Sequence, residues 1–235
     1  SDLSLVLPCF NPQPGWEEVV RSCFSALSEC WGGNAELILV LDGASVTVTE
    51  QALDHLRANI PSLRVITYPE NHGKGYATRK GVEAATGDII LYTDIDFPYT
   101  SASICEVYKA LATGGCDVAI GVKNADYYSH VPFVRRVISR VLRLGTRTLL
   151  SMPITDTQCG LKGFNRAAAT VFLSTTIDRY LFDLEFVYKC TAGKTLRMVA
   201  IPVTLKENIR FRSMNYRILL PEMRNFISLL FNKNR

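Results

Sequence analysis

The chain has 235 residues, of which 48% are hydrophobic and 20% charged, and its formal net charge is +4. This is the composition of a globular protein with a substantial core, and it excludes a disordered or low-complexity chain. No apolar run approaches the roughly 20 residues that cross a bilayer, and no signal peptide is expected. Because the first residue is Ser1, a membrane anchor outside this sequence stays open.

Cysteine and histidine are poorly arranged for a zinc site. The seven cysteines are scattered, contain no Cys-x-x-Cys, and are accompanied by only three histidines. We therefore expect reduced cysteines in the core of an intracellular protein.

Short apolar runs alternate with helical patterns through the first half of the chain. We expect strands at residues 3–7, 36–41, 63–68, 88–93 and 117–122, and helices at residues 16–30, 49–59, 75–85 and 101–112. Strands that alternate with helices form right-handed βαβ units, which build a mostly parallel sheet. The predicted fold class is therefore α/β, with helices flanking a mostly parallel, Rossmann-like sheet.

The second half is less regular. An arginine-rich amphipathic segment is followed by a short strand, a helix, a strand and a final helix, at residues 131–150, 159–164, 181–191, 196–205 and 219–231. Because no linker separates the halves, we expect a single domain of residues 1–235. The basic segment and the final helix both have the pattern of a membrane-surface helix. Helices that cover the core, with arginines extended over apolar neighbours, explain them as well, and the final helix also fits a lead into a transmembrane segment.

Polar side chains follow four of the predicted strands. They are Asn11 (after Pro8), Asp42, Lys74 within residues 71–75, and the pair Asp94 and Asp96. Ligands bind beyond the carboxyl ends of parallel strands, so we expect these residues at one edge of the sheet. Each of them alone also fits an ordinary turn or strand end. Together they predict a site for a nucleotide phosphate and a metal ion.

The paired carboxylates indicate which metal. Two carboxylates without histidine or cysteine partners suit a hard cation such as Mg²⁺ or Mn²⁺, bridged to substrate phosphates. The sequence has no Gly-x-x-x-x-Gly-Lys-Ser/Thr, and no Gly-x-Gly-x-x-Gly after the first strand. These absences disfavour P-loop enzymes and dinucleotide oxidoreductases.

Five segments, in this order, resemble the inverting nucleotide-sugar glycosyltransferases of the GT-A fold. They are residues 7–11 (LPCFN), 41–45 (LDGAS), 71–77 (NHGKGYA), 94–96 (DID) and 156–164 (DTQCGLKGF). The nearest branch is the dolichyl- and polyprenyl-phosphate sugar synthases, especially the dolichyl-phosphate glucose synthases. Those enzymes share the DTQCG stretch and a later Phe-Asp-x-Glu, here residues 182–185 (FDLE).

The resemblance implies a nucleotide-sugar-binding half, residues 1–122, and an acceptor-side half, residues 123–235. Asp94 would contact ribose or metal, and Asp96 would bind the metal on the diphosphate. Two departures, Pro12 and Leu41, stand where the family usually has acidic residues, so the choice between UDP and GDP sugars stays open. The residues that would border the nucleoside are Pro8, Asn11 and Asp42, with Lys74 nearby.

The resemblance also implies a polyprenyl or dolichyl phosphate as acceptor, at the cytoplasmic face of a membrane. The residues that would contact the acceptor phosphate or substrate are Lys123, Arg135, Arg136, Asp156, Gln158, Arg212 and Ser213. A phosphate acceptor is already ionised, whereas a glycan hydroxyl must lose a proton to a base. Asp183 or Glu185 would serve as that base, so the hydroxyl acceptor is the main alternative.

Other functions fit less well. A haloacid-dehalogenase-like phosphatase carries its Asp-x-Asp on the first strand, but here the pair follows the fourth strand and precedes Pro98. A sugar nucleotidyltransferase needs a glycine-rich loop after the first strand, where this chain has Pro8 and Asn11. A non-catalytic module that binds nucleotide sugars remains a third alternative. No nucleic-acid-binding motif is present, so nucleic acid is not an expected partner.

Overall fold

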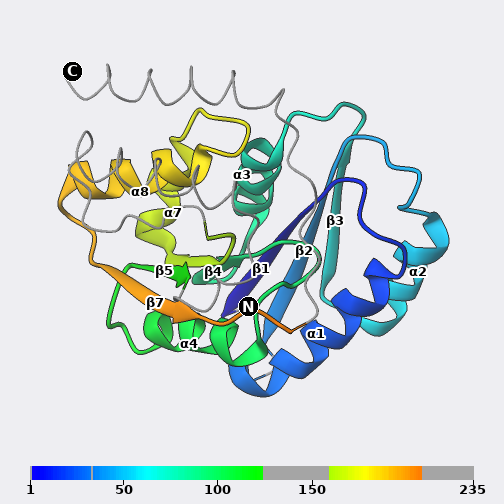
Figure 1. Cartoon of the computed structure of the whole chain (residues 1–235), viewed down its shortest axis with the longest axis horizontal. Helices are drawn as coiled ribbons and strands as arrows, with labels where there is room; N and C mark the ends of the chain where they lie inside the picture. Colours follow the sequence, from blue (N-terminus) through cyan, green and yellow to red (C-terminus); the bar gives the residue numbers. More distant parts are fainter. Residues whose placement is uncertain (1, 33, 124–158, 208–235) are drawn as a thin grey trace.

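The computed structural model describes residues 2–32, 34–123 and 159–207. Its centre is a seven-stranded sheet in the order β3-β2-β1-β4-β6-β5-β7, with β3 and β7 at opposite edges (Figure 1). Among the described strands only β6 runs antiparallel to its neighbours. The strands are β1 (Leu3–Cys9), β2 (Ala35–Asp42), β3 (Leu63–Tyr68), β4 (Ile89–Tyr92), β5 (Val118–Lys123), β6 (Lys162–Asn165) and β7 (Met198–Val203).

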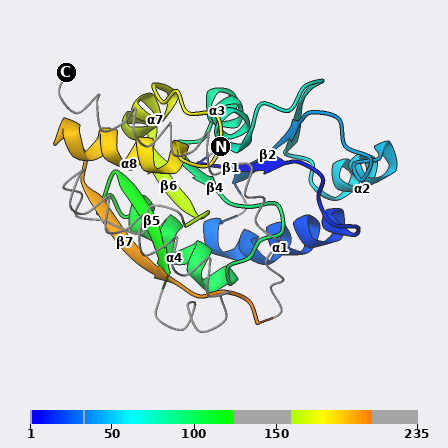
Figure 2. The same cartoon turned by 45° about the horizontal axis from the view of Figure 1, so that its top comes forward.

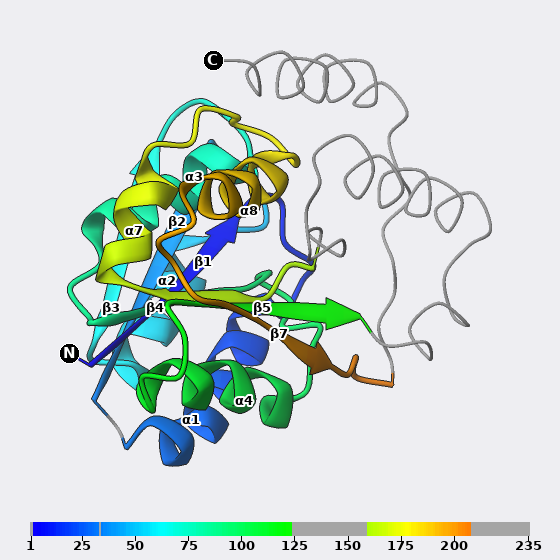
Figure 3. The same cartoon turned by 90° about the vertical axis from the view of Figure 1, so that its left-hand side faces the viewer.

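Helices cover both faces of the sheet (Figures 2 and 3). One layer contains α1 (Trp16–Trp31), α2 (Glu50–Asn59) and α4 (Ser101–Ala112), and the other contains α3 (Lys74–Ala84), α7 (Arg166–Leu173) and α8 (Phe182–Gly193). Successive strand residues face opposite layers, so Leu5 packs in the first core and Val6 in the second. All seven residues of β1 are buried, as expected for a central parallel strand.

The elements expected in the first half are confirmed, with bounds that agree to within two residues. In the second half, β6, α8 and β7 are also found where a strand, a helix and a strand were expected. The prediction missed α7. This helix begins at Arg166, and its N-cap is Asn165, the last residue of β6, whose side-chain oxygen accepts the Ala168 N–H at 3.1 Å. The segments 131–150 and 219–231 lie outside the described residues.

The expectation that all cysteines are reduced is wrong for one pair. Cys30 on α1 and Cys105 on α4 form a disulfide, with their Cα atoms 6.0 Å apart. The other five cysteines are free thiols. The pairing depends on the packing of α1 against α4, which brings together residues 75 positions apart, and no spacing in the sequence indicates it.

No helix in the described part of the chain is long and apolar enough to cross a membrane.

A buried carboxylate joins three elements at the edge of the sheet opposite the predicted site. Glu36 accepts hydrogen bonds from the Ser4 hydroxyl at 2.6 Å and from the N–H and hydroxyl of Thr86 at 2.6 and 2.7 Å. Arg64 approaches its other oxygen at 3.3 Å. Burial alone would raise the pKa of Glu36, but these donors lower it to about 2 from its ordinary value of 4.5.

We expect Glu36→Gln to reduce the free energy of unfolding at neutral pH by about 2 kcal/mol, because a charged acceptor is lost. The folded-state pKa is depressed, so this stabilisation is complete above pH 4.5 and is lost as pH falls toward about 2. Urea unfolding of both proteins between pH 7 and pH 2 should therefore show their stabilities converging in acid. Glu83→Gln, at an exposed carboxylate paired with Lys80, is the control and should change little.

Candidate functional site

The carboxyl ends of β1 to β4 meet at one edge of the sheet, as expected from their parallel pairing. The reversed strand β6 brings its first residues to the same edge, because Tyr92 at the end of β4 pairs with Lys162 at the start of β6. Residues 159–162 therefore lie beside the end of β4. Sequence reasoning identified the strand ends, but not the contribution of the antiparallel strand.

Asp94 and Lys74 form the central charge pair of this edge. The Lys74 ammonium lies 2.5 Å from Asp94 Oδ1, with 21% of the lysine side chain and 39% of the aspartate side chain exposed. Lys74 is the first residue of α3, which places it directly across from the end of β4. Burial opposes the charge of Lys74, but attraction to Asp94, Asp183 and Asp96 raises its pKa above the ordinary value. Lys74 therefore stays charged and balances Asp94.

Asp96 lies on a tight turn that starts at Asp94. The Phe97 N–H donates to the Asp94 carbonyl at 2.9 Å, and the Phe97 ring is fully buried although its φ is +44°. A bulky residue rarely adopts this left-handed conformation, so the buried ring fixes a strained turn. Asp96 is exposed on this turn. Of the two carboxylates, Asp96 is therefore the more accessible to a ligand.

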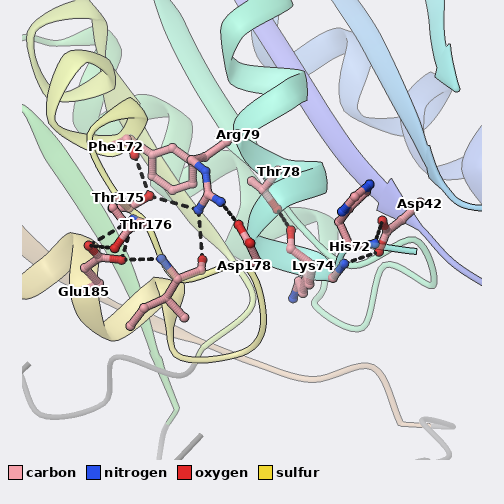
Figure 4. A network of polar contacts seen from close by, with 12 residues as sticks. Asp42, His72, Lys74, Thr78, Arg79, Phe172, Thr175, Thr176, Asp178 and Glu185 are labelled. Atoms are coloured by element: carbon pink, nitrogen blue, oxygen red, sulfur yellow. Dashed lines mark hydrogen bonds and ion pairs between the residues drawn. The ribbon is translucent and has the colours of Figure 1, made fainter. Parts of the chain in front are cut away.

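Asp42 holds the loop that precedes Lys74 (Figure 4). Its carboxylate accepts hydrogen bonds from the N–H groups of His72 and Gly73, both at 2.9 Å, from the Asn71 amide at 2.8 Å and from the Tyr68 hydroxyl at 3.0 Å. Four donors fill the lone-pair sites of a carboxylate. In this arrangement Asp42 positions the loop of residues 71–73, and its contact with a nucleoside stays a prediction.

Pro8 and Asn11 lie at the end of β1. Pro8 is buried beyond the pairing with β4, which ends at Val6, so its missing N–H breaks no ladder hydrogen bond on that side. Asn11 is exposed and has a φ of +45°, a conformation that asparagine tolerates better than most residues. Both residues are at the predicted edge, and their contact with a nucleoside stays a prediction.

Gly160 lies against the Asp94 carboxylate. A Cβ atom added to Gly160 would come within 2.3 Å of Asp94 Oδ2 and 3.5 Å of Lys74 Nζ. The Tyr99 hydroxyl accepts the Gly160 N–H at 3.1 Å and contacts the Cys159 thiol at 3.2 Å. The Cys159–Gly160 turn therefore packs against the ion pair of Asp94 and Lys74. The DTQCG motif in the sequence did not indicate this contact.

Asp183, on the first turn of α8, belongs to a buried cluster. The fully buried Lys162 ammonium lies 2.7 Å from Asp183 Oδ1, and the Tyr92 hydroxyl donates to the same oxygen. Lys162 also donates to the Cys159 carbonyl at 2.5 Å. Only 6% of the Asp183 side chain is exposed. Sequence analysis named Asp183 but missed both of its partners.

Glu185 binds a loop instead of facing the edge (Figure 4). Its carboxylate accepts the N–H of Thr176 at 2.8 Å and the N–H of Ile177 at 2.8 Å, and Lys189 lies 3.3 Å away. Arg79 of α3 binds the same loop through the Ile177 carbonyl at 2.9 Å and through Asp178.

The start of α3 packs against the same loop, at residues 177–178. The Asp178 carbonyl accepts the Tyr76 N–H at 3.1 Å, and added Cβ atoms at Gly73 and Gly75 would come within 2.6 and 2.5 Å of the loop backbone. The two glycines are therefore needed for this close approach. The Arg79 and Glu185 contacts consequently help to place Lys74.

We expect Glu185→Gln to destabilise the protein by about 2 kcal/mol, because an amide NH₂ in place of Oε1 would face the Thr176 N–H and the Lys189 ammonium. Thermal unfolding checks this, and hydrogen exchange should show faster exchange at Thr176 and Ile177. The matched control is Glu106→Gln, at an exposed carboxylate 3.7 Å from Lys109. Equal stability of the two variants would contradict a structural role for Glu185.

Lys123 ends β5 and pairs with Val203, and β5 runs in the same direction as β4 because both are antiparallel to β6. It therefore lies at the same edge, on the side of β6. The other residues expected on the acceptor side lie outside the described residues: Arg135, Arg136, Asp156, Gln158, Arg212 and Ser213.

The carboxylates at the edge fit a hard divalent ion held partly by substrate. In the described ranges, no group of three or more His, Cys, Asp or Glu side chains could hold a metal by itself. If a metal binds at this edge, Asp94 and Asp96 would supply oxygen ligands, and phosphate oxygens and water would complete the shell. This donor set is the one that Mg²⁺ and Mn²⁺ use with nucleotides.

Two curated relatives align with most of the length of this chain. The dolichyl-phosphate beta-glucosyltransferase of Saccharomyces cerevisiae is 28% identical over 224 residues, which cover 87% of this chain and 67% of the relative. The Drosophila melanogaster enzyme of the same name is 29% identical over 203 residues, covering 80% of this chain and 62% of the relative. The chain thus spans about two thirds or less of the length of these relatives.

Solved structures share the fold. Glucosyl-3-phosphoglycerate synthase from Mycobacterium tuberculosis, in complex with Mn²⁺, UDP and glucosyl-3-phosphoglycerate, matches with a TM-score of 0.64 at 19% identity, covering 98% of this chain and 78% of that one. A mannosyltransferase from Pyrobaculum calidifontis with GDP-Man and Mn²⁺ matches with a TM-score of 0.53 at 17% identity, covering 88% and 58%. The expected GT-A fold is confirmed.

The family match also removes the phosphatase and nucleotidyltransferase alternatives. Residues 4–172 match the family described as glycosyl transferase family 2, and the named relatives are glycosyltransferases. The chain therefore belongs to glycosyl transferase family 2 and is a GT-A glycosyltransferase.

Proposed function

We propose that this glycosyltransferase moves a hexose from a nucleotide-diphosphate sugar to a polyprenyl or dolichyl phosphate at the cytoplasmic face of a membrane. The names of the relatives support this acceptor, and the nucleotides in the structural neighbours support a UDP or GDP sugar as donor. The transfer inverts the anomeric carbon. An acceptor phosphate oxygen forms the new bond to this carbon as its bond to the donor diphosphate breaks.

The choice of acceptor rests on the two candidate bases, whose carboxylates already accept hydrogen bonds from other groups of the protein. Asp183 Oδ1 receives Lys162 and Tyr92, and the Glu185 carboxylate receives two backbone N–H groups. Both carboxylates are nearly inaccessible, with 6% and 3% of their side chains exposed. A general base must reach the proton that it removes. A phosphate acceptor needs no base, so this arrangement favours phosphate over a glycan hydroxyl.

The donor would bind along the edge formed by β1 to β4. Lys74 holds Asp94 through the 2.5 Å ion pair, and the exposed Asp96 would face the diphosphate of the donor. A bound Mg²⁺ or Mn²⁺ would offset the negative charge that develops on the leaving diphosphate. Asp42 would act indirectly, by fixing the loop that carries Lys74. Pro8 and Asn11 would border the nucleoside.

A donor-by-acceptor screen tests the proposal. Radiolabelled UDP-glucose and GDP-mannose are each incubated with dolichyl phosphate or with a soluble oligosaccharide, in Mn²⁺ or in EDTA. We expect labelled product in the organic phase, dependent on the metal and on dolichyl phosphate. Label transferred only to the oligosaccharide would contradict the lipid-phosphate acceptor and support the hydroxyl alternative. Equal transfer in EDTA would contradict the metal.

A further inference from the structure

Two buried side chains hold the Cys159–Gly160 turn from different sides. Lys162 donates to the Cys159 carbonyl at 2.5 Å, and Tyr99 accepts the Gly160 N–H at 3.1 Å. Lys162 is fully buried and Tyr99 is 4% exposed, so neither contact competes with solvent. The turn itself lies against Asp94, because a Cβ at Gly160 would come within 2.3 Å of Asp94 Oδ2. The position of Asp94 therefore depends on that of the turn.

Lys162 is an unusual residue for this place. It lies on β6 in the middle of the sheet, on the same face as Phe164, and its ammonium is 5.6 Å from the centre of the Tyr92 ring. Lysine is almost never fully buried unless it is paired. Its pairing with Asp183 explains how the charge is tolerated, but not why a charge is present within an otherwise aromatic cluster. The second contact of Lys162, its hydrogen bond to the turn that lies against Asp94, gives a reason for a charge at this position.

We propose that Lys162 is a positioning residue for donor binding: it holds the Cys159–Gly160 turn against Asp94, and Asp183 serves mainly as its counter-charge. This inference rests on the proposed role of Asp94 in binding the donor and its metal. Residues that orient metal ligands typically contribute about 10- to 100-fold to metal affinity or activity. Lys162 would act in this way without touching the donor.

The decisive variant is the double substitution Lys162→Met with Asp183→Asn. It removes both buried charges together, so no charge is left unpaired, and the amide introduced by Asp183→Asn keeps an acceptor for the Tyr92 hydroxyl. If Lys162 only neutralises Asp183, this protein should bind the donor normally. If Lys162 holds the turn, the protein should be folded but should bind the donor about tenfold more weakly or worse.

Calorimetry with UDP and with GDP, each in Mn²⁺, gives the affinities, and steady-state kinetics with the active donor gives KM and kcat. We expect the double variant to raise the donor KM about 10- to 100-fold, with kcat at saturating donor changed by less than about twofold. A loss of folded protein alone would lower the apparent kcat and leave KM unchanged. Leu56→Ala, a buried core position on α2 in the other helix layer, is the control for lowered stability and should leave KM unchanged.

Tyr99→Phe is the second arm, because it removes the other contact of the same turn without changing any charge. It should also raise the donor KM, and it carries the comparison alone if the double variant does not fold. Normal donor affinity in Tyr99→Phe, or in a folded double variant, would overturn the proposal. If the wild-type protein binds neither UDP nor GDP, the proposed function fails first, and the role of Lys162 fails with it.

Discussion

Gly160→Ala should weaken donor binding by about 100-fold while leaving the protein folded. The new Cβ would come 2.3 Å from Asp94 Oδ2, a distance that real contacts do not reach, so the Asp94 carboxylate must move. Because Lys74 lies 2.5 Å from the other oxygen of Asp94, that movement breaks the ion pair. The backbone of Gly160 needs no positive φ, so the expected damage is local.

Calorimetry with UDP or GDP in Mn²⁺ measures the affinity, and thermal unfolding reports the stability. The control is Gly193→Ala, where the nearest atom to an added Cβ is Thr195 Oγ1 at 3.8 Å. Gly193→Ala should bind the nucleotide like the wild type. Wild-type affinity in Gly160→Ala would show that the position of Asp94 does not matter for the donor.

Asp183→Asn should destabilise the protein by about 3–5 kcal/mol, because it leaves the fully buried Lys162 without its counter-charge. That is a large share of the roughly 5–15 kcal/mol by which domains are stable. Urea unfolding at neutral pH measures the loss. Adding Lys162→Met to Asp183→Asn should recover most of it, since the unpaired charge is then removed.

Asp54→Asn is the control for Asp183→Asn. Asp54 lies 2.8 Å from Arg57 but is 67% exposed, so its loss should cost well under about 1 kcal/mol. Equal stability of the Asp183→Asn protein and the wild type would contradict the buried ion pair.

The same reasoning affects tests for a catalytic base: inactivity of Asp183→Asn alone does not identify a base, because misfolding gives the same result. The double variant with Lys162→Met separates the two explanations.

The secondary structure of the first half could be predicted because its signals lie within short segments of the sequence. Apolar runs such as residues 37–41 mark buried parallel strands, and the polar residues Asp42 and Asp94 directly follow strands. Parallel pairing then requires their ends to meet at one edge, so the candidate donor site followed from order along the chain. α7 was missed because its main signal in the sequence is the N-cap Asn165, which is also the last residue of the four-residue strand β6.

The hydrogen-bond and ion-pair partners of the site residues could not be predicted from the sequence. The order of the strands brought Lys74 and Asp94 to one edge but did not predict their direct ion pair across 20 positions. Nothing near Asp183 indicates Lys162 or Tyr92, which lie 21 and 91 positions away. The Cys30–Cys105 disulfide was hidden for the same reason. Each of these contacts joins different secondary-structure elements.

The sequence by itself determined the α/β fold, the edge where polar residues gather and, through family resemblance, the class of reaction. Only the tertiary structure decided which partners the charged residues have there. It assigned Asp42 and Glu185 to holding loops, Lys74 to pairing with Asp94, and Asp183 to a buried ion pair. The physical reason is that the role of a carboxylate depends on which donors surround it and on how much water reaches it. Both depend on packing between residues far apart in the chain.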